Sequence, residues 1–499
     1  MIRPLSRGIG VALAVGVALA LAIPSSPLPA AAEVAPDTPA LNWVVNTAPG
    51  GPSEETLRAA IADAGGTFLI SYPEIGVTVV RAPEGGFAAQ LRDLPWVQSV
   101  GPTRTSTTPD RLPDPAESAA GVTEEPEAMP AEGTAWDTVA VGATTPGGAG
   151  VVVGVADNGI DAGHPDLADR IDPALSVGCG IKGVPDTRPA AWAPEAGLSG
   201  AHGTHVAGSI AGAADGAGIR GIAPDARVAA IKVDNQTGHI YPEASICATM
   251  WAVRHDIPVV NHSYYVDPWY VWCAGDETQS AALEALRRTY AYAHEQGVVS
   301  VAAVGNEAQD LATMTTDVVS PNDGAPEPRP VDSSCLKALA GLPDVISVAA
   351  ADQDETSGAV VMARFSNYGA GTVTVTAPGV VWSAVTRQDD GSIYALFPGT
   401  SMASPHVAGL AARLLAADPQ DTLIVLDLAN AGAVGGRAVV DIDLTAFADV
   451  EVPVPPVGEV ERTARGLRWT LTLDSAQKAQ LQIPATSGDD PAFPVVAVR

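Results

Sequence analysis

Basic side chains are scarce in this 499-residue chain. It carries 27 lysines and arginines against 57 aspartates and glutamates, which gives a formal net charge of −30 at pH 7. Nucleic acids and anionic membrane surfaces attract positively charged proteins, so this balance argues against both as partners. We expect a soluble, salt-tolerant, monomeric protein.

Long apolar runs are missing beyond the first 23 residues. Arg3 and Arg7 precede an apolar run over Ile9–Ile23, and small residues at 29–32 then offer a cleavage site. This run is too short for a membrane span and is typical of a secretory signal peptide, which we place at residues 1–32. No later stretch approaches about 18 uninterrupted apolar residues, so we expect a secreted, extracellular protein without a membrane segment.

Metal-binding spacings are also missing. Carboxylates show no EF-hand-like pattern, and the pair His202 and His205 has no third ligand cluster at a zinc-like spacing. We therefore predict no metal at the functional site and no cofactor for its chemistry.

Cysteine is rare, with only four residues in the chain. Export would favour disulfides, and four cysteines allow three pairings. Cys273 and Cys335 both lie in loop-like surroundings, so we favour that pair. Cys179 has no assigned partner, and Cys247 lies in a helical pattern where it could equally be a buried free thiol.

The most informative stretch of the chain is GTSMASPHVA, which surrounds Ser401. Gly399 permits a backbone geometry that a side chain would obstruct, and small residues after Ser401 let a helix begin close to its neighbours. Unpaired N–H groups in that first turn can face a developing negative charge. Taken alone, Ser401 could equally cap a buried helix, so its interpretation depends on partners elsewhere.

Two candidate partners lie upstream. Asp157 ends the β-branched run Val151–Ala156, at the carboxyl end of a buried strand, where open α/β sheets place their chemistry. An Asx turn is the alternative for this aspartate. His202 opens the apolar helical segment HGTHVAG, and histidine exchanges a proton near neutral pH.

These segments together resemble the subtilisin-like serine peptidase family, whose acid, base and nucleophile follow in the order Asp, His, Ser. By this resemblance Asp157 in DNGIDAGHPDL is the acid, His202 is the base and Ser401 is the nucleophile. The base would take the serine proton during attack, and the acid would hold the imidazole in the useful tautomer. The resemblance implies a serine endopeptidase that forms an acyl-enzyme intermediate on protein or peptide substrates.

An oxyanion site is implied by the same resemblance. The apolar run Val298–Val304 ends in Gly305 and Asn306 and is similar to the family's AAGN segment. The Asn306 side chain and the Ser401 backbone N–H would then donate to the oxyanion. A simple turn asparagine is the alternative reading of Asn306.

The segment at 261–265 departs from the family, which usually has Asn-Met-Ser-Leu-Gly where this chain has Asn-His-Ser-Tyr-Tyr. We expect Tyr264, Tyr265 and Trp269 to wall the substrate cleft, although these rings could instead pack under a surface loop. Strand alternation turns His262 toward the interior, which predicts a hydrogen-bonded core histidine. The predicted substrate-binding residues are Ser263, Tyr264, Tyr265 and Gly305.

The fold class follows from alternating helical and β-rich runs, such as 244–255 before 258–260, which favour a parallel sheet between helices. The family resemblance implies a subtilisin-like three-layer α/β fold. Residues 41–100 show a βαββαβ order of patterns. In this position they resemble the inhibitory propeptide of subtilisin-like precursors, and an ordinary accessory domain is the alternative.

We therefore expect five segments: a signal peptide at 1–32, an inhibitory propeptide at 33–107, an acidic Pro/Ala/Glu linker at 108–134, a catalytic domain at 135–450 and a tail at 451–499. The propeptide would act as an intramolecular inhibitor. The family also implies that structural calcium could be bound. The competing function is a non-catalytic peptide-binding protein, and a membrane-anchored maturation peptidase would need a C-terminal membrane helix that the sequence lacks.

Overall fold

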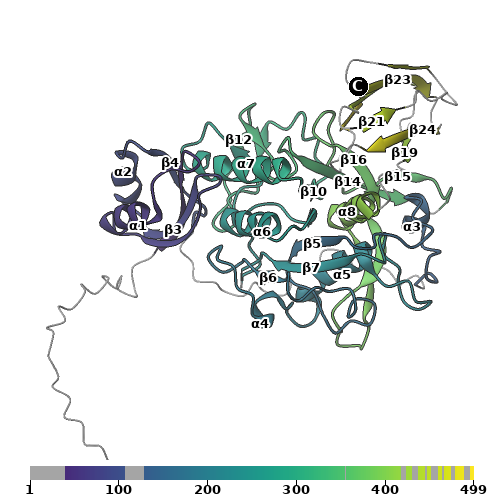
Figure 1. Ribbon diagram of the computed structural model, residues 1–499, viewed down its shortest axis with the longest axis horizontal. Helices are drawn as coiled ribbons and strands as arrows, with labels where there is room; N and C mark the ends of the chain where they lie inside the picture. Colours follow the sequence, from purple (N-terminus) through teal and green to yellow (C-terminus); the bar gives the residue numbers. More distant parts are fainter. Residues whose placement is uncertain are drawn as a thin grey trace, which may run out of the picture. The chain divides into compact units, whose positions relative to one another are not determined.

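The computed structural model describes residues 40–106 and 129–416, except 236 and 355, together with strands between 423 and 498 (Figure 1). The predicted signal peptide and most of the predicted linker lie outside these residues. Of the predicted tail, only the strands are described.

The N-terminal domain, residues 40–106, forms a four-stranded antiparallel sheet in the order β2-β3-β1-β4, with two helices. Its elements are β1 (Ala40–Thr47), α1 (Glu54–Asp63), β2 (Thr67–Tyr72), β3 (Val77–Pro83), α2 (Phe87–Arg92) and β4 (Val97–Pro102). Leu57, Ile61, Phe87 and Leu91 bury the helices against the sheet. The βαββαβ prediction is confirmed.

A mostly parallel sheet forms the centre of the second domain, in the order β15-β14-β10-β8-β5-β7-β6, with β16 also pairing β14. Only β15 runs antiparallel to its neighbour. The strands are β5 (Val152–Asp157), β6 (Val177–Gly178), β7 (Arg227–Lys232), β8 (Val259–His262), β10 (Val299–Ala303), β14 (Val345–Gln353), β15 (Val360–Met362) and β16 (Val375–Pro378). This arrangement confirms the α/β prediction.

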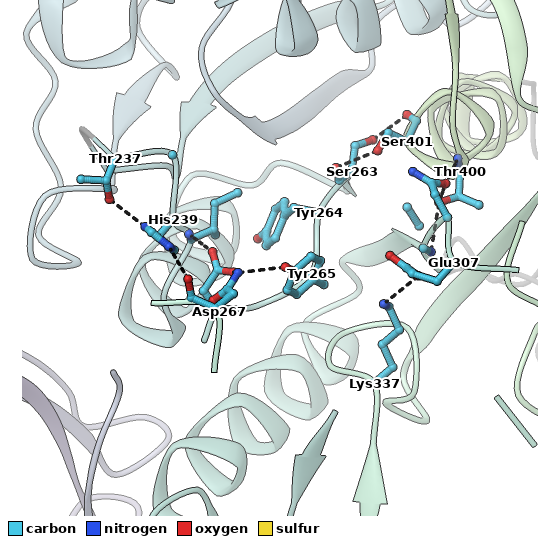
Figure 2. Close-up of a pocket in the computed structure, with 16 residues that line it drawn as sticks. Thr237, His239, Ser263, Tyr264, Tyr265, Asp267, Glu307, Lys337, Thr400 and Ser401 are labelled. Carbon is cyan, nitrogen blue, oxygen red and sulfur yellow. Dashed lines mark hydrogen bonds and ion pairs between the residues drawn. The ribbon is translucent and has the colours of Figure 1, made fainter. Parts of the chain in front are cut away.

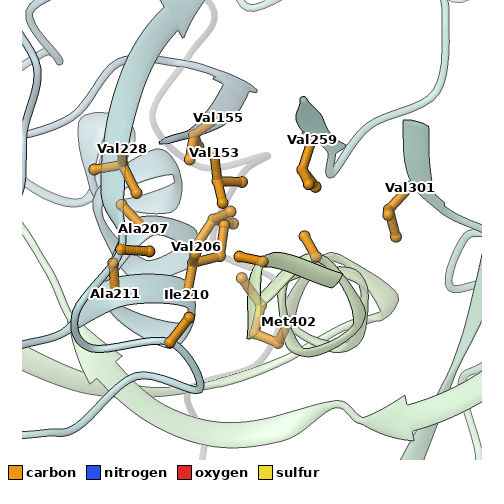
Figure 3. Close-up of a cluster of buried hydrophobic side chains, with 14 of the residues drawn as sticks. Val153, Val155, Val206, Ala207, Ile210, Ala211, Val228, Val259, Val301 and Met402 are labelled. Carbon is orange, nitrogen blue, oxygen red and sulfur yellow. The ribbon is translucent and has the colours of Figure 1, made fainter. Parts of the chain in front are cut away.

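Helices cover both faces of this sheet. Successive residues of its strands therefore belong to different buried clusters. On one face Val153 and Val155 pack with α5 (Ala201–Ala211) and α8 (Thr400–Ala416), and Figure 3 shows their side chains converging. On the other face Ala156 and Ala302 pack with residues of α6 (Pro242–Arg254) and α7 (Ser280–Glu295), respectively. The predicted three layers are therefore present.

The remaining elements are short or belong to the C-terminal strands. Between the larger elements lie α3 (Trp136–Ala140), α4 (Pro189–Trp192), η1 (Leu198–Gly200), β9 (Trp272–Cys273), β11 (Thr316–Asp317), β12 (Arg329–Pro330), β13 (Cys335–Leu336), β17 (Val380–Ala384) and β18 (Tyr394–Pro398). The C-terminal strands are β19 (Leu423–Ala429), β20 (Gly436–Asp443), β21 (Phe447–Val450), β22 (Glu459–Arg462), β23 (Gly466–Leu473), β24 (Lys478–Ser487) and β25 (Val495–Val498).

All four cysteines are paired, as Cys179–Cys247 and Cys273–Cys335. The Cys273–Cys335 disulfide confirms the pairing predicted from the sequence. The reading of Cys247 as a free thiol is wrong, because α6 carries it to within a Cα–Cα distance of 5.7 Å of Cys179, which follows β6.

The N-terminal domain packs on α6 and α7, and its apolar residues Val44 and Val77 join the cluster that those helices bury. The Asn46 side-chain amide donates to the Ala281 carbonyl at 2.8 Å. A side chain at Gly101 would place its Cβ 2.8 Å from that of Ala281, so the approach of β4 to α7 requires glycine. This close fit buries one face of β1, while Leu41, Trp43 and Val45 on the other face pack under the domain's own helices, so β1 is buried along nearly its whole length.

Candidate active site

Asp157 and His202 form a close pair. Asp157 ends β5, and its Oδ1 lies 2.8 Å from Nδ1 of His202 in the first turn of α5. The Asp157 side chain is 4% exposed and that of His202 is 35% exposed. A carboxylate can only accept, so Nδ1 carries the proton and Nε2 is left to accept one. This is the tautomer that a general base needs.

Negative charge sets the protonation of His202. Burial alone would lower the pKa of this imidazole, but the charge and hydrogen bond of Asp157, together with the charge of Asp234, raise it above its ordinary value. Asp234 lies just beyond β7, and its Oδ1 is 2.8 Å from Nζ of Lys232. Two carboxylates therefore act on the imidazole, although only Asp157 contacts it by a hydrogen bond among the interactions of the described residues.

Ser401 lies in the first turn of α8. Its hydroxyl donates to the Ser263 carbonyl, just beyond β8, at 3.1 Å. In return the Ser263 hydroxyl donates to the Ser401 carbonyl at 2.8 Å. The hydrogen bonds of the described residues include none between Ser401 and His202, so the structure joins the predicted acid to the base but does not hydrogen-bond the base to the serine.

Asn306 is tied to the residue before Ser401. Its Oδ1 accepts from the Thr400 backbone N–H at 2.8 Å and from the Thr400 hydroxyl at 2.9 Å. The same hydroxyl accepts from the Gly305 N–H at 3.0 Å, and Gly305 has a φ of 102°, which favours glycine. With the Asn306 carbonyl oxygen occupied by two donors, its Nδ2 is left to donate to another group.

A cavity of about 480 Å³ opens beside Ser401 (Figure 2). It runs between the segments that follow β8 and β10, and it includes all four predicted substrate-binding residues together with Asn306. Its lining residues are Thr237, Gly238, His239, Ile240, Ser263, Tyr264, Tyr265, Asp267, Ala303, Gly305, Asn306, Glu307, Asn322, Lys337, Thr400 and Ser401.

Tyr264 lines this cavity with its ring while its hydroxyl points to the interior. That hydroxyl lies 3.2 Å from the Ser245 hydroxyl and 3.0 Å from Nδ1 of His262. His262 is fully buried, and burial lowers its pKa to about 3, so its imidazole is neutral. The prediction of a hydrogen-bonded core histidine is confirmed.

Tyr265 also lines the cavity, and its hydroxyl accepts from Nδ2 of Asn322 at 2.8 Å. The expectation for Trp269 is wrong, because this ring is not part of the cavity wall. It packs instead under the guanidinium of Arg329, 4.7 Å from the ring centroid. Here the alternative of an aromatic ring packed beneath a loop describes the structure.

Sequence reasoning missed Lys337 and the inward side chain of Glu307. Lys337 follows β13, 31 residues after Asn306 in the chain. Its Nζ lies 3.8 Å from Oε2 of Glu307 and 3.3 Å from the centroid of the Tyr270 ring. The only sequence signal was a lone lysine in the apolar stretch 336–342, which gives no hint of the cavity.

Within the described residues, no group of three or more His, Cys, Asp or Glu side chains is placed to hold a metal ion. No helix of that part of the chain is long and apolar enough to cross a membrane.

Comparison with known sequences finds one matching family. Residues 148–429 match a family described as the subtilase family. The chain is 29% identical to fervidolysin of Fervidobacterium pennivorans over 394 residues, covering 70% of this chain and 49% of that protein. It is 34% identical to subtilisin NAT of Bacillus subtilis subsp. natto over 273 residues, covering 54% of this chain and 57% of that protein. The chain thus spans about half the length of these relatives.

Solved structures share the fold. A variant of the epidermin leader peptide processing serine protease of Staphylococcus aureus superimposes with a TM-score of 0.57 at 17% identity, covering 75% of this chain and 89% of that one. The crystal structure of fervidolysin, described as a keratinolytic enzyme related to subtilisin, superimposes with a TM-score of 0.51 at 20% identity. The match covers 90% of this chain and 70% of that one.

Proposed function

The chain belongs to the subtilase family, and we propose that it is a secreted serine endopeptidase made as a self-inhibited precursor. The observation that carries this proposal is the Asp157–His202 hydrogen bond of 2.8 Å at the carboxyl end of β5, together with Ser401 in the first turn of α8. The family order of acid, base and nucleophile assigns each of these residues its role.

In the proposed reaction, the Ser401 hydroxyl turns from the Ser263 carbonyl and gives its proton to Nε2 of His202 as Oγ attacks the peptide carbonyl. Asp157 stabilises the imidazolium that forms. Nδ2 of Asn306 and the Ser401 N–H stabilise the oxyanion. The imidazolium then protonates the leaving amine, and water repeats the sequence on the acyl-enzyme. None of these steps calls for a metal or an organic cofactor.

The N-terminal domain is the proposed intramolecular inhibitor. Its last described residues leave the sheet toward the cavity, since the backbone N–H groups of Thr105 and Ser106 donate to Asp323 at 2.9 and 3.3 Å. Asp323 directly follows Asn322 of the cavity wall. These contacts place the end of the described N-terminal domain beside the cavity wall, which supports obstruction of the cleft by this domain until the linker is cut.

Two observations favour the second candidate, a non-catalytic peptide-binding protein. The Ser401 hydroxyl is occupied by Ser263, and the tyrosine at 265 narrows the place where the family usually has glycine. Such a protein would keep peptide affinity without turnover.

Hydrolysis of casein by the purified full chain, compared with Ser401→Ala, separates the two functions. We expect turnover by the parent alone, together with an N-terminal fragment released only from the parent. Equal behaviour of the two proteins would reject the endopeptidase, and an uncleaved precursor in the active parent would reject self-processing.

A further inference from the structure

The cavity begins at the atoms that would perform the reaction. Ser401 and Asn306 line it, together with residues of the segments that follow β8 and β10. A peptide carbonyl held between Ser401 Oγ and the Asn306 amide has its own Cα one bond away. The side chain of that residue therefore has this cavity of about 480 Å³ as its nearest available space.

Lys337 supplies an ammonium group without a hydrogen-bond acceptor to this cavity. Its side chain is 3% exposed, and Nζ has no hydrogen-bond partner in the described structure. The nearest carboxylate oxygen, Oε2 of Glu307, lies 3.8 Å from Nζ. A dashed line marks this pair in Figure 2. Leaving such a donor group buried without an acceptor is costly unless a ligand supplies one.

Glu307 is already supplied with donors. Its Oε2 accepts from the Tyr270 hydroxyl and from Nδ2 of Asn367, the latter at 2.8 Å. The Glu307 backbone N–H also donates to Asn367, at 3.2 Å. The carboxylate therefore has its hydrogen bonds without Lys337, and the unsatisfied group of the pair is the cation.

The charge of Lys337 persists at neutral pH. Burial lowers the pKa of its amine to about 8, while the charges of Glu307 and Asp317 act in the opposite direction. The rings of Tyr270 and Tyr265 face the ammonium, with centroids at 3.3 and 5.1 Å, and favour its charged form. A protonated amine thus faces the cavity below about pH 8.

Tyr265, another lining residue of the cavity, also offers a hydrogen-bond donor. The Tyr265 hydroxyl accepts from Asn322 at 2.8 Å, which leaves its own proton to donate. The segment that directly precedes Lys337 is fixed in place. Cys335 is bonded to Cys273, and β13 pairs with β9.

We propose that Lys337 makes this cavity select an acidic side chain, Glu or Asp, at the residue whose carbonyl carbon Ser401 attacks, an inference that rests on the proposed function. The carboxylate of that residue accepts from Nζ of Lys337 and from the Tyr265 hydroxyl. A neutral isostere leaves the buried ammonium unsatisfied, and a basic side chain meets it with like charge.

The test uses fluorogenic peptides that differ only in the residue before the scissile bond, which is Glu, Gln, Leu or Lys. The active preparation from the full chain should show a kcat/KM for Glu about 10 to 100 times that for Gln, because a hydrogen bond to a charged group contributes that much. Lys should be the poorest of the four. Equal values for Glu and Gln, or a preference for Lys, would overturn the inference.

Two variants test whether Lys337 causes the preference for Glu over Gln. Lys337→Met should bring the Glu-to-Gln ratio close to one, and this ratio is unaffected by a loss of folded enzyme. Glu307→Gln should raise the ratio, because it removes the competing negative charge; a fall would contradict the assignment. Failure to cleave any peptide or casein would reject the proposed function and this inference together, whereas cleavage without a Glu preference rejects the inference alone.

Discussion

Arg104 at the end of the N-terminal domain forms an ion pair with Glu243 in the first turn of α6, and the two side chains are 12% and 1% exposed. The Asn42 side-chain amide donates to the same carboxylate at 2.7 Å. Glu243 is thus a buried charge of the second domain whose partners Arg104 and Asn42 come from the N-terminal domain.

Acid should therefore weaken the attachment of the N-terminal domain. Burial alone would raise the pKa of Glu243, but Arg104, Thr103 and Asn42 hold it below its ordinary value. The stabilisation is then fully present above the ordinary glutamate pKa of about 4.3 and is lost as pH falls through the lowered pKa. Thermal unfolding of the Ser401→Ala chain between pH 7 and pH 3 would measure this loss.

In that background Glu243→Gln should cost about 3 kcal/mol at pH 7, since it removes the carboxylate from a largely buried ion pair. Its stability should also depend less on acid. The exposed pair of Arg58 and Glu54, at 53% and 59% exposure, provides the control. Arg58→Gln should change stability by less than about 0.5 kcal/mol, and an equal loss in both variants would contradict the role of the buried pair.

Asn306→Ala should lower kcat by about 100 to 1,000-fold with little change in KM, because the lost donor acts on the oxyanion and not on the bound substrate. Thr400→Val removes the hydroxyl that positions Asn306 and should give a smaller loss in kcat. Steady-state kinetics on one peptide would distinguish the two. A rise in KM with kcat unchanged would place Asn306 in substrate binding instead.

Asp234→Asn should move the acid limb of the kcat/KM profile to lower pH. His202 must be neutral to accept the serine proton, and the Asp234 charge helps to raise its pKa. Removing that charge lowers the pKa and extends activity into more acidic solution. Asp215→Asn, which changes a carboxylate that does not act on His202, serves as the matched control, and an identical shift in both variants would reject the local effect.

Tyr265→Gly should broaden the residues accepted before the scissile bond, because it removes one wall of the cavity beside Ser401. Trp269→Ala removes a ring from the same segment that does not line the cavity. Profiling both variants against one peptide library compares them directly. An unchanged preference in Tyr265→Gly, or the same change in both, would show that the tyrosine does not shape the cavity.

The two disulfides should differ in what their loss affects. Replacing either pair by serine should cost about 2 to 4 kcal/mol of stability. Only the Cys273–Cys335 replacement should also reduce discrimination among peptides, because it frees the segment that carries Lys337. A matching loss of discrimination on replacing Cys179 and Cys247 would contradict this assignment.

Predictions from the sequence succeeded where the signal was local. The buried run that ends at Asp157 and the βαββαβ pattern each depend on neighbouring residues, and both elements formed as expected. His262 could be placed in the core because strand alternation fixes the direction of its side chain.

Predictions failed where the path of a loop decides the outcome. Trp269 lies four residues after Tyr265, yet its ring packs against Arg329 of β12 and does not line the cavity. Lys337 lines the cavity two residues after Cys335, which is bonded to the distant Cys273, and neither periodicity nor motif spacing carries that information. The pairing of Cys247 likewise depends on the approach of two elements 68 residues apart.

Thr400 has a wider consequence than its hydrogen bonds suggest. It binds Gly305 and Asn306 and is the residue directly before Ser401. A displacement of α8 should therefore move the proposed nucleophile Ser401 and the proposed amide donor Asn306 together, so that the distance between them changes little. Evolution can then change other lining residues of the cavity, such as Tyr265 and Lys337, and so alter which peptides enter while the reacting atoms keep their spacing.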